Sequence, residues 1–353
     1  MTTAALQLPV LCVTLGSRFP LPERVEQSTW PEFQYCGTGD GRAIKHNKWL
    51  GERAQCQNLL GSHRRTCWHS SPYLHGGPGG SLGRGGYRKR HDHSRFRIIG
   101  LDQRGCGKST PLVQDILDHL SENTTQALIE DIEAVREHLG IDKWIVTGVS
   151  WGSTLALAYA LERPNRVLGI ALVAVTTSSR EEIQWIPEEV GRIFPEEWTD
   201  FSEAANAAPG ERLVEAYARR LAGKDREDAR LAALSGDRWE STHISMDPNW
   251  QPGPLFEEER ERMTFALLVT HYWSLDGFLI DGQEIIARIH ELNGIPGCLI
   301  HGRRDISGPV VTAWKLHRRW ESSRLVVIED EGHGGSASMT ALTQAVEEIA
   351  ARV

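Results

Sequence analysis

The feature that most constrains this fold is a strand-to-helix junction at residues 143–160, KWIVTGVSWGSTLALAYA. A β-branched apolar run leads directly into Gly148, Ser150 and Gly152, and an Ala- and Leu-rich segment with helical character follows. A Gly-x-Ser-x-Gly sequence between a strand and a helix is typical of a tight turn that lifts a serine hydroxyl above the edge of a sheet. Flanking glycines let the backbone turn sharply. The junction predicts an α/β fold with Ser150 as a candidate nucleophile.

Strands and helices alternate along much of the chain, which indicates a mainly parallel sheet with helices on both faces. From about residue 178 to residue 289 the sequence becomes helix-rich, charged and tryptophan-containing, without a convincing strand. We expect this stretch to form an inserted helical cap, so that the core spans residues 1–177 and 291–353 and the cap spans 178–290. Expected strands are 96–101, 144–147, 167–175, 297–300 and 324–328, and expected helices include 124–139 and 339–352.

Composition excludes several classes of partner. The formal net charge of −8 and the pI near 6.0 argue against a nucleic-acid-binding protein, for which a basic domain is expected. No apolar run reaches the roughly 20 residues that cross a bilayer, and the N-terminus lacks the pattern of a signal peptide. We therefore expect a cytoplasmic protein with no membrane partner.

A serine nucleophile needs a base within hydrogen-bond reach, and that base must be oriented by a carboxylate. In folds that carry the serine on such a strand-to-helix turn, the nucleophile elbow, the acid and then the histidine follow the serine along the chain. Asp305 lies in the loop after the expected strand 297–300, and His333 lies between glycines after the strand 324–328. Each alone could be an ordinary loop residue, but their joint position predicts a catalytic triad with Ser150.

The glycine-rich segment from His75 to Gly80, HGGPGG, fits a further chemical need. A tetrahedral intermediate places negative charge on an oxygen, which backbone N–H groups of a glycine loop can approach closely. We expect the N–H groups of Gly77 and Trp151 to form this oxyanion hole. The alternative is a glycine-rich turn without a catalytic role.

Metal and nucleotide sites are not indicated. The spacing of Cys56, His63, Cys67 and His69 fits no common structural zinc site. The segment 105–110, GCGKST, resembles the end of a phosphate-binding loop, but Asp102 stands where such a loop needs glycine. We expect neither a metal nor an organic cofactor.

Taken together, several motifs resemble the proline iminopeptidases, or prolyl aminopeptidases, of the α/β-hydrolase fold. The resemblance covers about residue 73 to the C-terminus. The motifs are far more specific together than any one of them alone. Its motifs are HGGPGG at 75–80, DQRGCGKS at 102–109, GVSWGSTLALAYA at 148–160, FPEEW at 194–198, Trp239-Glu240, HGRRD at 301–305 and GHG at 332–334.

The resemblance implies release of an N-terminal proline from a peptide or small amide, through an acyl-enzyme on Ser150 and without a cofactor. It also implies that Glu240, which follows Trp239, holds the free amino group of the substrate. Such a pairing would give both affinity and selectivity for a free N-terminus, because a substrate with a blocked N-terminus would leave the carboxylate without a cation. A solvated helix residue is the alternative for Glu240. The cap aromatics, including Trp185, Trp239, Phe265 and Tyr272, are expected mainly to pack the cap.

Two departures from the family pattern affect these expectations. Some members use a glutamate in a FARIENHYF-like helix as a second amine ligand, whereas the matching segment 265–273 has Val269 there. Asp276 or another cap acid could compensate, or the substrate could be a different proline derivative or amide. The second departure is the segment 41–71, which lacks strand-like alternation and suggests an unusual insertion or a shifted reading frame.

Two other functions share most of these features. A carboxylesterase or amidase would use the same triad and oxyanion loop but would not need a free amine. A non-catalytic binding protein on a hydrolase scaffold would follow from poorly formed N-terminal strands. Haloalkane or epoxide chemistry is disfavoured, because that branch carries aspartate at the position of Ser150.

Overall fold

The computed structural model describes residues 10–15, 32–35, 69–83, 86–88, 91–245 and 253–353. Of the segment 41–71, where the sequence suggests an insertion or a frame shift, residues 41–68 lie outside the described part of the chain, as do Cys56, His63 and Cys67.

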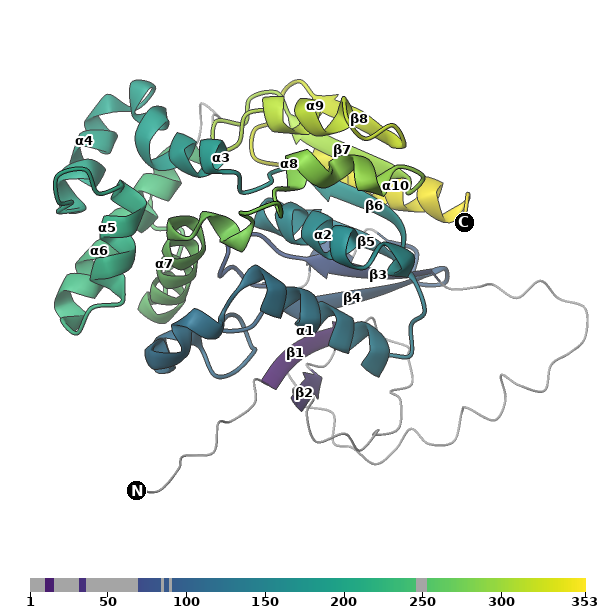
Figure 1. Cartoon of the computed structure of the whole chain (residues 1–353), viewed down its shortest axis with the longest axis horizontal. Helices are drawn as coiled ribbons and strands as arrows, with labels where there is room; N and C mark the ends of the chain where they lie inside the picture. The colour runs from purple at the N-terminus through teal and green to yellow at the C-terminus, as the bar shows by residue number, and fades with distance from the viewer. Residues whose placement is uncertain (1–9, 16–31, 36–68, 84–85, 89–90, 246–252) are drawn as a thin grey trace, which may run out of the picture.

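A single eight-stranded sheet forms the centre of the described chain, in the order β2-β1-β4-β3-β5-β6-β7-β8 (Figure 1). Neighbouring strands pair in parallel except β1 and β4, which are antiparallel, so the predicted mainly parallel sheet is confirmed. The strands are β1 Val10–Leu15, β2 Glu32–Tyr35, β3 His69–Leu74, β4 Phe96–Asp102, β5 Trp144–Val149, β6 Val167–Val173, β7 Gly297–Gly302 and β8 Ser323–Ile328.

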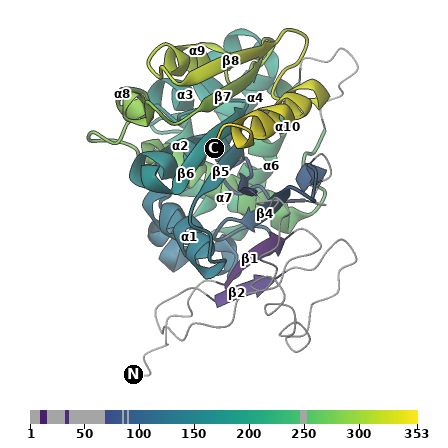
Figure 2. The same cartoon turned by 90° about the vertical axis from the view of Figure 1, so that its right-hand side faces the viewer.

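Helices cover both faces of the sheet, which explains the continuous apolar runs of its central strands. Successive side chains of a strand point to opposite faces. In β6, Ile170 and Leu172 belong to one hydrophobic cluster, and Ala171 and Val173 belong to the other. The first cluster includes α1 and α2, and the second includes α10, on the other side of the sheet (Figure 2). These helices are α1 Thr125–His138, α2 Trp151–Glu162 and α10 Ser336–Ala350.

Between β6 and β7, the described residues form helices and no strand, as the sequence predicts. Most of these helices lie to one side of the sheet, at the left of Figure 1. They are α3 Arg180–Gln184, α4 Pro195–Ala204, α5 Leu213–Leu221, α6 Arg226–His243, α7 Glu259–Ser274 and α8 Ile285–Arg288; α9 Val311–His317 follows β7. In the part of the chain that the structure describes, no helix is both long and apolar enough to cross a membrane. The cytoplasmic location stays a prediction.

Strand β3 is better formed than its sequence suggests. The apolar run before His75 consists of Tyr73 and Leu74, yet the strand extends back to His69 and pairs with β4 over its full length. The buried Ser71 is accommodated because its hydroxyl donates to the Ile145 carbonyl at 2.7 Å. Residues 69–71, the described end of the segment 41–71, therefore form a strand although the segment lacks strand-like alternation.

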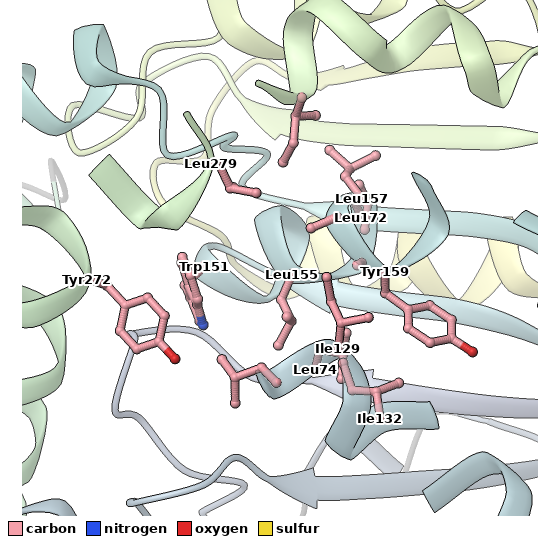
Figure 3. Close-up of a cluster of buried hydrophobic side chains, with 14 of the residues drawn as sticks. Leu74, Ile129, Ile132, Trp151, Leu155, Leu157, Tyr159, Leu172, Tyr272 and Leu279 are labelled. Atoms are coloured by element: carbon pink, nitrogen blue, oxygen red, sulfur yellow. The ribbon is translucent and has the colours of Figure 1, made fainter. Parts of the chain in front are cut away.

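The first helix after the elbow is anchored between the sheet and α7. Trp151 begins α2, and its ring packs on Tyr272 of α7 with centroids 4.8 Å apart (Figure 3). The Tyr272 hydroxyl donates to the Asn123 side-chain oxygen at 2.6 Å, and both aromatic rings are buried. Tyr272 therefore packs the junction between α7 and the core.

Candidate active site

Ser150 stands at a strained point between β5 and α2. Its φ of 56° and ψ of −126° place a residue with a side chain in a region that L-amino acids rarely adopt. The flanking glycines serve a different need. A Cβ atom at Gly148 would overlap the carbonyl oxygen of Gly152, and one at Gly152 would overlap that of Leu74. The glycines thus permit close backbone approach, while the serine itself carries the strain.

The structure brings the three predicted triad residues together in one hydrogen-bonded chain. The Ser150 hydroxyl lies 2.9 Å from Nε2 of His333. Nδ1 of His333 lies 2.9 and 3.1 Å from the two carboxylate oxygens of Asp305. Asp305 follows β7 and His333 follows β8, so the carboxyl ends of neighbouring parallel strands deliver both side chains to the elbow. The arrangement allows His333 to accept the serine proton while Asp305 orients the ring.

Asp305 has further partners that the sequence reasoning missed. The Gly308 N–H donates to Oδ1 at 2.9 Å, and Nε2 of His301 lies 3.4 Å from Oδ2. The Val175 N–H donates to Nδ1 of His301, which places the ring proton on Nε2. The fully buried His301 therefore presents an N–H to the Gly308 carbonyl and to the Asp305 side. The i, i+4 spacing of His and Asp in HGRRD was the available signal.

Charge and burial act in opposite directions on the two titrating groups. Burial opposes the negative charge of Asp305, but His333 and the hydrogen bonds from His301 and His333 outweigh it and hold the pKa of the carboxyl well below its usual range. Burial would lower the pKa of His333, but Asp305 and then Glu240 raise it above its ordinary value. At neutral pH, Asp305 is therefore an anion that stabilises a positive charge on the imidazole.

Gly77 and Trp151, the two expected oxyanion donors, line one pocket with Ser150 and His333. Trp151 is the first residue of α2, so its N–H has no acceptor within the helix. Gly77 has a φ of 124°, and a Cβ there would overlap neither Ser150 nor His333 but would crowd the backbone N of Gly79 and Gly80. The glycine loop is thus folded tightly on itself beside the nucleophile.

Gln103 joins this loop to the elbow. Its side-chain amide donates to the His75 carbonyl at 3.0 Å, and its oxygen accepts from the Trp151 indole at 2.9 Å. Its own backbone N–H donates to Nε2 of His75, whose Nδ1 then donates to the Gly76 carbonyl. This buried network fixes the HGGPGG segment against α2 and involves a second residue that sequence reasoning did not single out.

The pocket above Ser150 is walled by the helices that follow β6. Trp185 and Trp273 supply aromatic surface, and Ile183 and Ile186 supply aliphatic surface. The Trp185 indole donates to the Ile306 carbonyl at 2.7 Å, which ties the wall to the loop that carries Asp305. The pocket can therefore hold a compact apolar group beside the nucleophile.

Glu240 and Trp239, the predicted substrate-binding pair, lie side by side on α6 but have different surroundings. Glu240 on α6 raises the pKa of His333, which places its charge within electrostatic reach of the triad. Trp239 is buried and stacks on Phe201 with centroids 5.3 Å apart, and its indole donates to the Ile186 carbonyl at 3.3 Å. Both residues line a second cavity, and neither lines the pocket at Ser150. Trp239 packs among the helices, as expected for most of the aromatics.

His243, one turn after Glu240, links α6 to the loop that carries Asp305. Its ring is buried, with Nδ1 2.8 Å from the Ser307 hydroxyl and Nε2 3.5 Å from the Glu240 carboxylate. Burial lowers the pKa of His243, although Glu240 acts in the opposite direction. The ring therefore spans the space between the candidate amine ligand and the triad.

The position of the missing second carboxylate is clear in the structure. Val269 is buried and lines the same cavity as Glu240. Asp276, which could have compensated, is instead bound by Arg180 and Arg212, each at 3.0 Å, and lines neither this cavity nor the pocket at Ser150. Compensation by Asp276 is therefore wrong, because two arginines already bind its carboxylate outside both spaces, whereas compensation by another cap acid stays a prediction.

Comparison with known proteins agrees with this geometry. A family model described as the alpha/beta hydrolase fold matches residues 73–336. The chain is 37% identical over 285 residues to a probable proline iminopeptidase of Leptolyngbya boryana, covering 79% of this chain and 86% of the relative. It is 37% identical over 288 residues to the proline iminopeptidase of Neisseria gonorrhoeae, covering 80% and 88%.

A plant relative and a solved structure extend the comparison. The proline iminopeptidase of Arabidopsis thaliana is 36% identical over 270 residues, covering 76% of this chain and 70% of the relative. A crystal structure of proline iminopeptidase from Mycobacterium smegmatis superposes with a TM-score of 0.54 at 18% identity, covers 83% of this chain and 93% of its own, and shows the shared fold. The chain belongs to the proline iminopeptidase family of the α/β-hydrolase fold.

Proposed function

We propose that this protein is a serine hydrolase that releases N-terminal proline from peptides or small amides through an acyl-enzyme on Ser150. The observation that carries the proposal is the position of Glu240, a carboxylate within electrostatic reach of a hydrogen-bonded Ser150–His333–Asp305 chain. A nucleophile explains amide cleavage, and a nearby carboxylate explains why the substrate would carry a free amine. The names of the relatives in the family agree with this activity.

In the first step, the Ser150 hydroxyl attacks the prolyl carbonyl while His333 accepts its proton. The 2.9 Å separation of Oγ and Nε2 suits this transfer. Asp305 stabilises the imidazolium that results, which the raised pKa of His333 reflects. His333 then gives the proton to the leaving amine, and the carbon–nitrogen bond breaks.

The charge that develops on the carbonyl oxygen is assigned to the backbone N–H groups of Gly77 and Trp151. Both residues line the pocket with Ser150, and the free N–H at the start of α2 adds the positive end of the helix dipole. Loss of one such donor typically costs about 100- to 1000-fold in turnover. The hydrogen bonds of Gln103 hold the segment that contains Gly77 against the start of α2, where Trp151 lies.

In the second step, water activated by His333 hydrolyses the prolyl ester and frees Ser150. Each proton in this scheme moves between Ser150, His333, water and the leaving amine, and each charge is met by groups of the chain itself. The proposed chemistry therefore calls for neither a metal nor an organic cofactor.

Substrate recognition is assigned to the helical residues 178–290, which we propose act as a cap between the core parts 1–177 and 291–353. The pyrrolidine ring would lie against Trp185 and Trp273 in the pocket above Ser150. Its ammonium group would pair with Glu240 in a partly desolvated position, where a charge-assisted hydrogen bond is strong. Trp239 would support Glu240 by holding α6 against Phe201 and Ile186.

The test is hydrolysis of proline β-naphthylamide and of a Pro-Gly dipeptide by purified protein, with Ser150→Ala as the matched control. We expect naphthylamine and free proline from the wild-type protein and none above background from the variant. Cleavage that persists in Ser150→Ala, or its absence in a folded wild-type protein, would overturn the proposal. Labelling of Ser150 by a fluorophosphonate would at the same time exclude a non-catalytic binding protein.

A further inference from the structure

A second cavity lies among the cap helices, directly next to the pocket at Ser150. Ile186 and Trp273 line both spaces, so they form the boundary between them. The wall of the second cavity is built by α4, α5, α6 and α7 and is mainly apolar, with Phe201, Val214, Leu221, Ala232, Phe265 and Val269 among its residues.

The polar groups of this cavity are satisfied by one another, with one exception. Asp237 and Arg262 form an ion pair at 2.8 Å. The Thr270 hydroxyl donates to the Ala266 carbonyl at 2.8 Å. Among the described residues, the Glu240 carboxylate lies 3.5 Å from Nε2 of the buried His243, a nitrogen that makes no hydrogen bond, and the Glu240 side chain is 20% exposed. An apolar cavity with one available carboxylate is complementary to a cation that carries an apolar group.

The position of Glu240 decides which part of a substrate could enter. Under the proposed function, the prolyl ring lies in the first pocket and its ammonium group pairs with Glu240, which lines the second cavity. Substituents on the ring carbons would then stay in the first pocket, whereas a substituent on the nitrogen would enter the second cavity. Val269 and Phe265 offer that substituent an apolar surface.

We propose that the second cavity binds an alkyl group on the substrate's amine nitrogen, so that the enzyme also hydrolyses N-alkylated prolyl amides. This inference rests on the function proposed above. Water cleaves the same amide bond, and the products are an N-alkylproline and the leaving amine. An alkylated nitrogen keeps its proton and its charge, and so still pairs with Glu240. An acyl group would remove that charge and leave the carboxylate without its partner.

The test compares proline, N-methylproline, N-propylproline and N-propanoylproline β-naphthylamides on the wild-type protein. Burial of a methylene is worth about 0.8 kcal/mol, or about fourfold, so the two added methylenes should raise kcat/KM about 15-fold from the N-methyl to the N-propyl substrate. The N-propanoyl substrate, equal in length but uncharged, should be cleaved at least tenfold more slowly than the N-propyl one.

Gly236 on α6 provides the variant that locates the effect. It lines the second cavity, and a Cβ atom there would meet no heavy atom within 4 Å. Gly236→Leu should therefore narrow the cavity and lower kcat/KM for the N-propyl substrate at least tenfold, while proline β-naphthylamide changes less than about twofold. Val214→Phe narrows the same cavity from α5 and should act in the same direction if Gly236→Leu does not fold.

The outcomes separate this inference from the function on which it rests. If the wild-type protein cleaves proline β-naphthylamide but not the N-propyl substrate, the cavity proposal is overturned and the proposed function stands. Equal loss on both substrates in a folded Gly236→Leu protein, or no loss on either, also overturns it. If no substrate is cleaved, the proposed function itself fails.

Discussion

The carboxylate of Glu240 raises the pKa of the His333 imidazole, although one residue lies on α6 and the other follows the last strand of the sheet. The candidate amine ligand and the candidate general base are therefore electrostatically coupled. His243 lies between Glu240 and the loop that carries Asp305, at 3.5 Å from the first and hydrogen-bonded to Ser307 of the second. Recognition of a cation at Glu240 would act directly on the basicity of the triad.

Glu240→Gln should shift the pH dependence of catalysis. His333 must be neutral to accept the serine proton, so activity rises as pH increases through its pKa. Removal of the Glu240 charge lowers that pKa, and the acidic limb of the kcat/KM profile should move to lower pH. A short-chain p-nitrophenyl ester is the appropriate substrate because it needs no amine ligand. The control variant Glu181→Gln alters an exposed carboxylate at the Ser150 pocket and should leave the pH of the acidic limb unchanged.

The same variant should weaken cleavage of substrates that carry a free amine. A hydrogen bond to a charged group contributes about 1.5–3 kcal/mol, so kcat/KM for proline β-naphthylamide should fall about 10- to 100-fold in Glu240→Gln. Cleavage of the p-nitrophenyl ester at a pH above the acidic limb should change little. Equal losses on both substrates would show that Glu240 supports the fold or the triad rather than the amine.

His301→Phe should impair both stability and turnover. The substitution leaves the buried Val175 N–H without its acceptor, which costs about 1–3 kcal/mol in the free energy of unfolding. It also removes an N–H from the side of Asp305, so kcat should fall because His333 is less well oriented. Urea unfolding and steady-state kinetics measure the two effects. The matched control His290→Phe, at an exposed histidine, should change neither the free energy of unfolding nor kcat. A wild-type kcat in His301→Phe would contradict the positioning role.

Gly152→Ala should disrupt the elbow. A Cβ atom there overlaps the Leu74 and His75 carbonyl oxygens, and overpacking of this kind typically costs about 1–3 kcal/mol. Gly236→Ala is the matched control, since its Cβ meets no heavy atom within 4 Å and its helical position favours alanine by up to about 1 kcal/mol. Thermal unfolding should therefore shift in opposite directions for the two variants. A stable, fully active Gly152→Ala protein would contradict the close approach seen at the elbow.

Features with a strong local pattern were predictable from the sequence. The apolar runs at β4, β5, β6 and β8 and the helical spacing of α1 correspond to elements with nearly the predicted bounds. The elbow was recognisable because its glycines and strand–helix flanks lie within one short segment. The order of Ser150, Asp305 and His333 along the chain, each after an expected strand, was enough to predict that they form a triad.

Features that depend on distant contacts were not predictable in the same way. Strand β3 has little apolar character, and its pairing on both sides comes from β4 and β5. His301 and Gln103 gain their roles from backbone groups far along the chain. Asp276 suggested a compensating charge, but the sequence did not reveal that Arg180 and Arg212 already bind it.

The most direct test of the account is the ratio of kcat/KM for proline β-naphthylamide to that for N-acetylproline β-naphthylamide, measured on the wild-type protein. If Glu240 pairs with the substrate's ammonium group, the free amine should be preferred at least 10- to 100-fold, because acetylation removes the charge and leaves the carboxylate unpaired. A ratio near or below one would contradict amine recognition at Glu240 and would identify the protein as an amidase or esterase on the same triad.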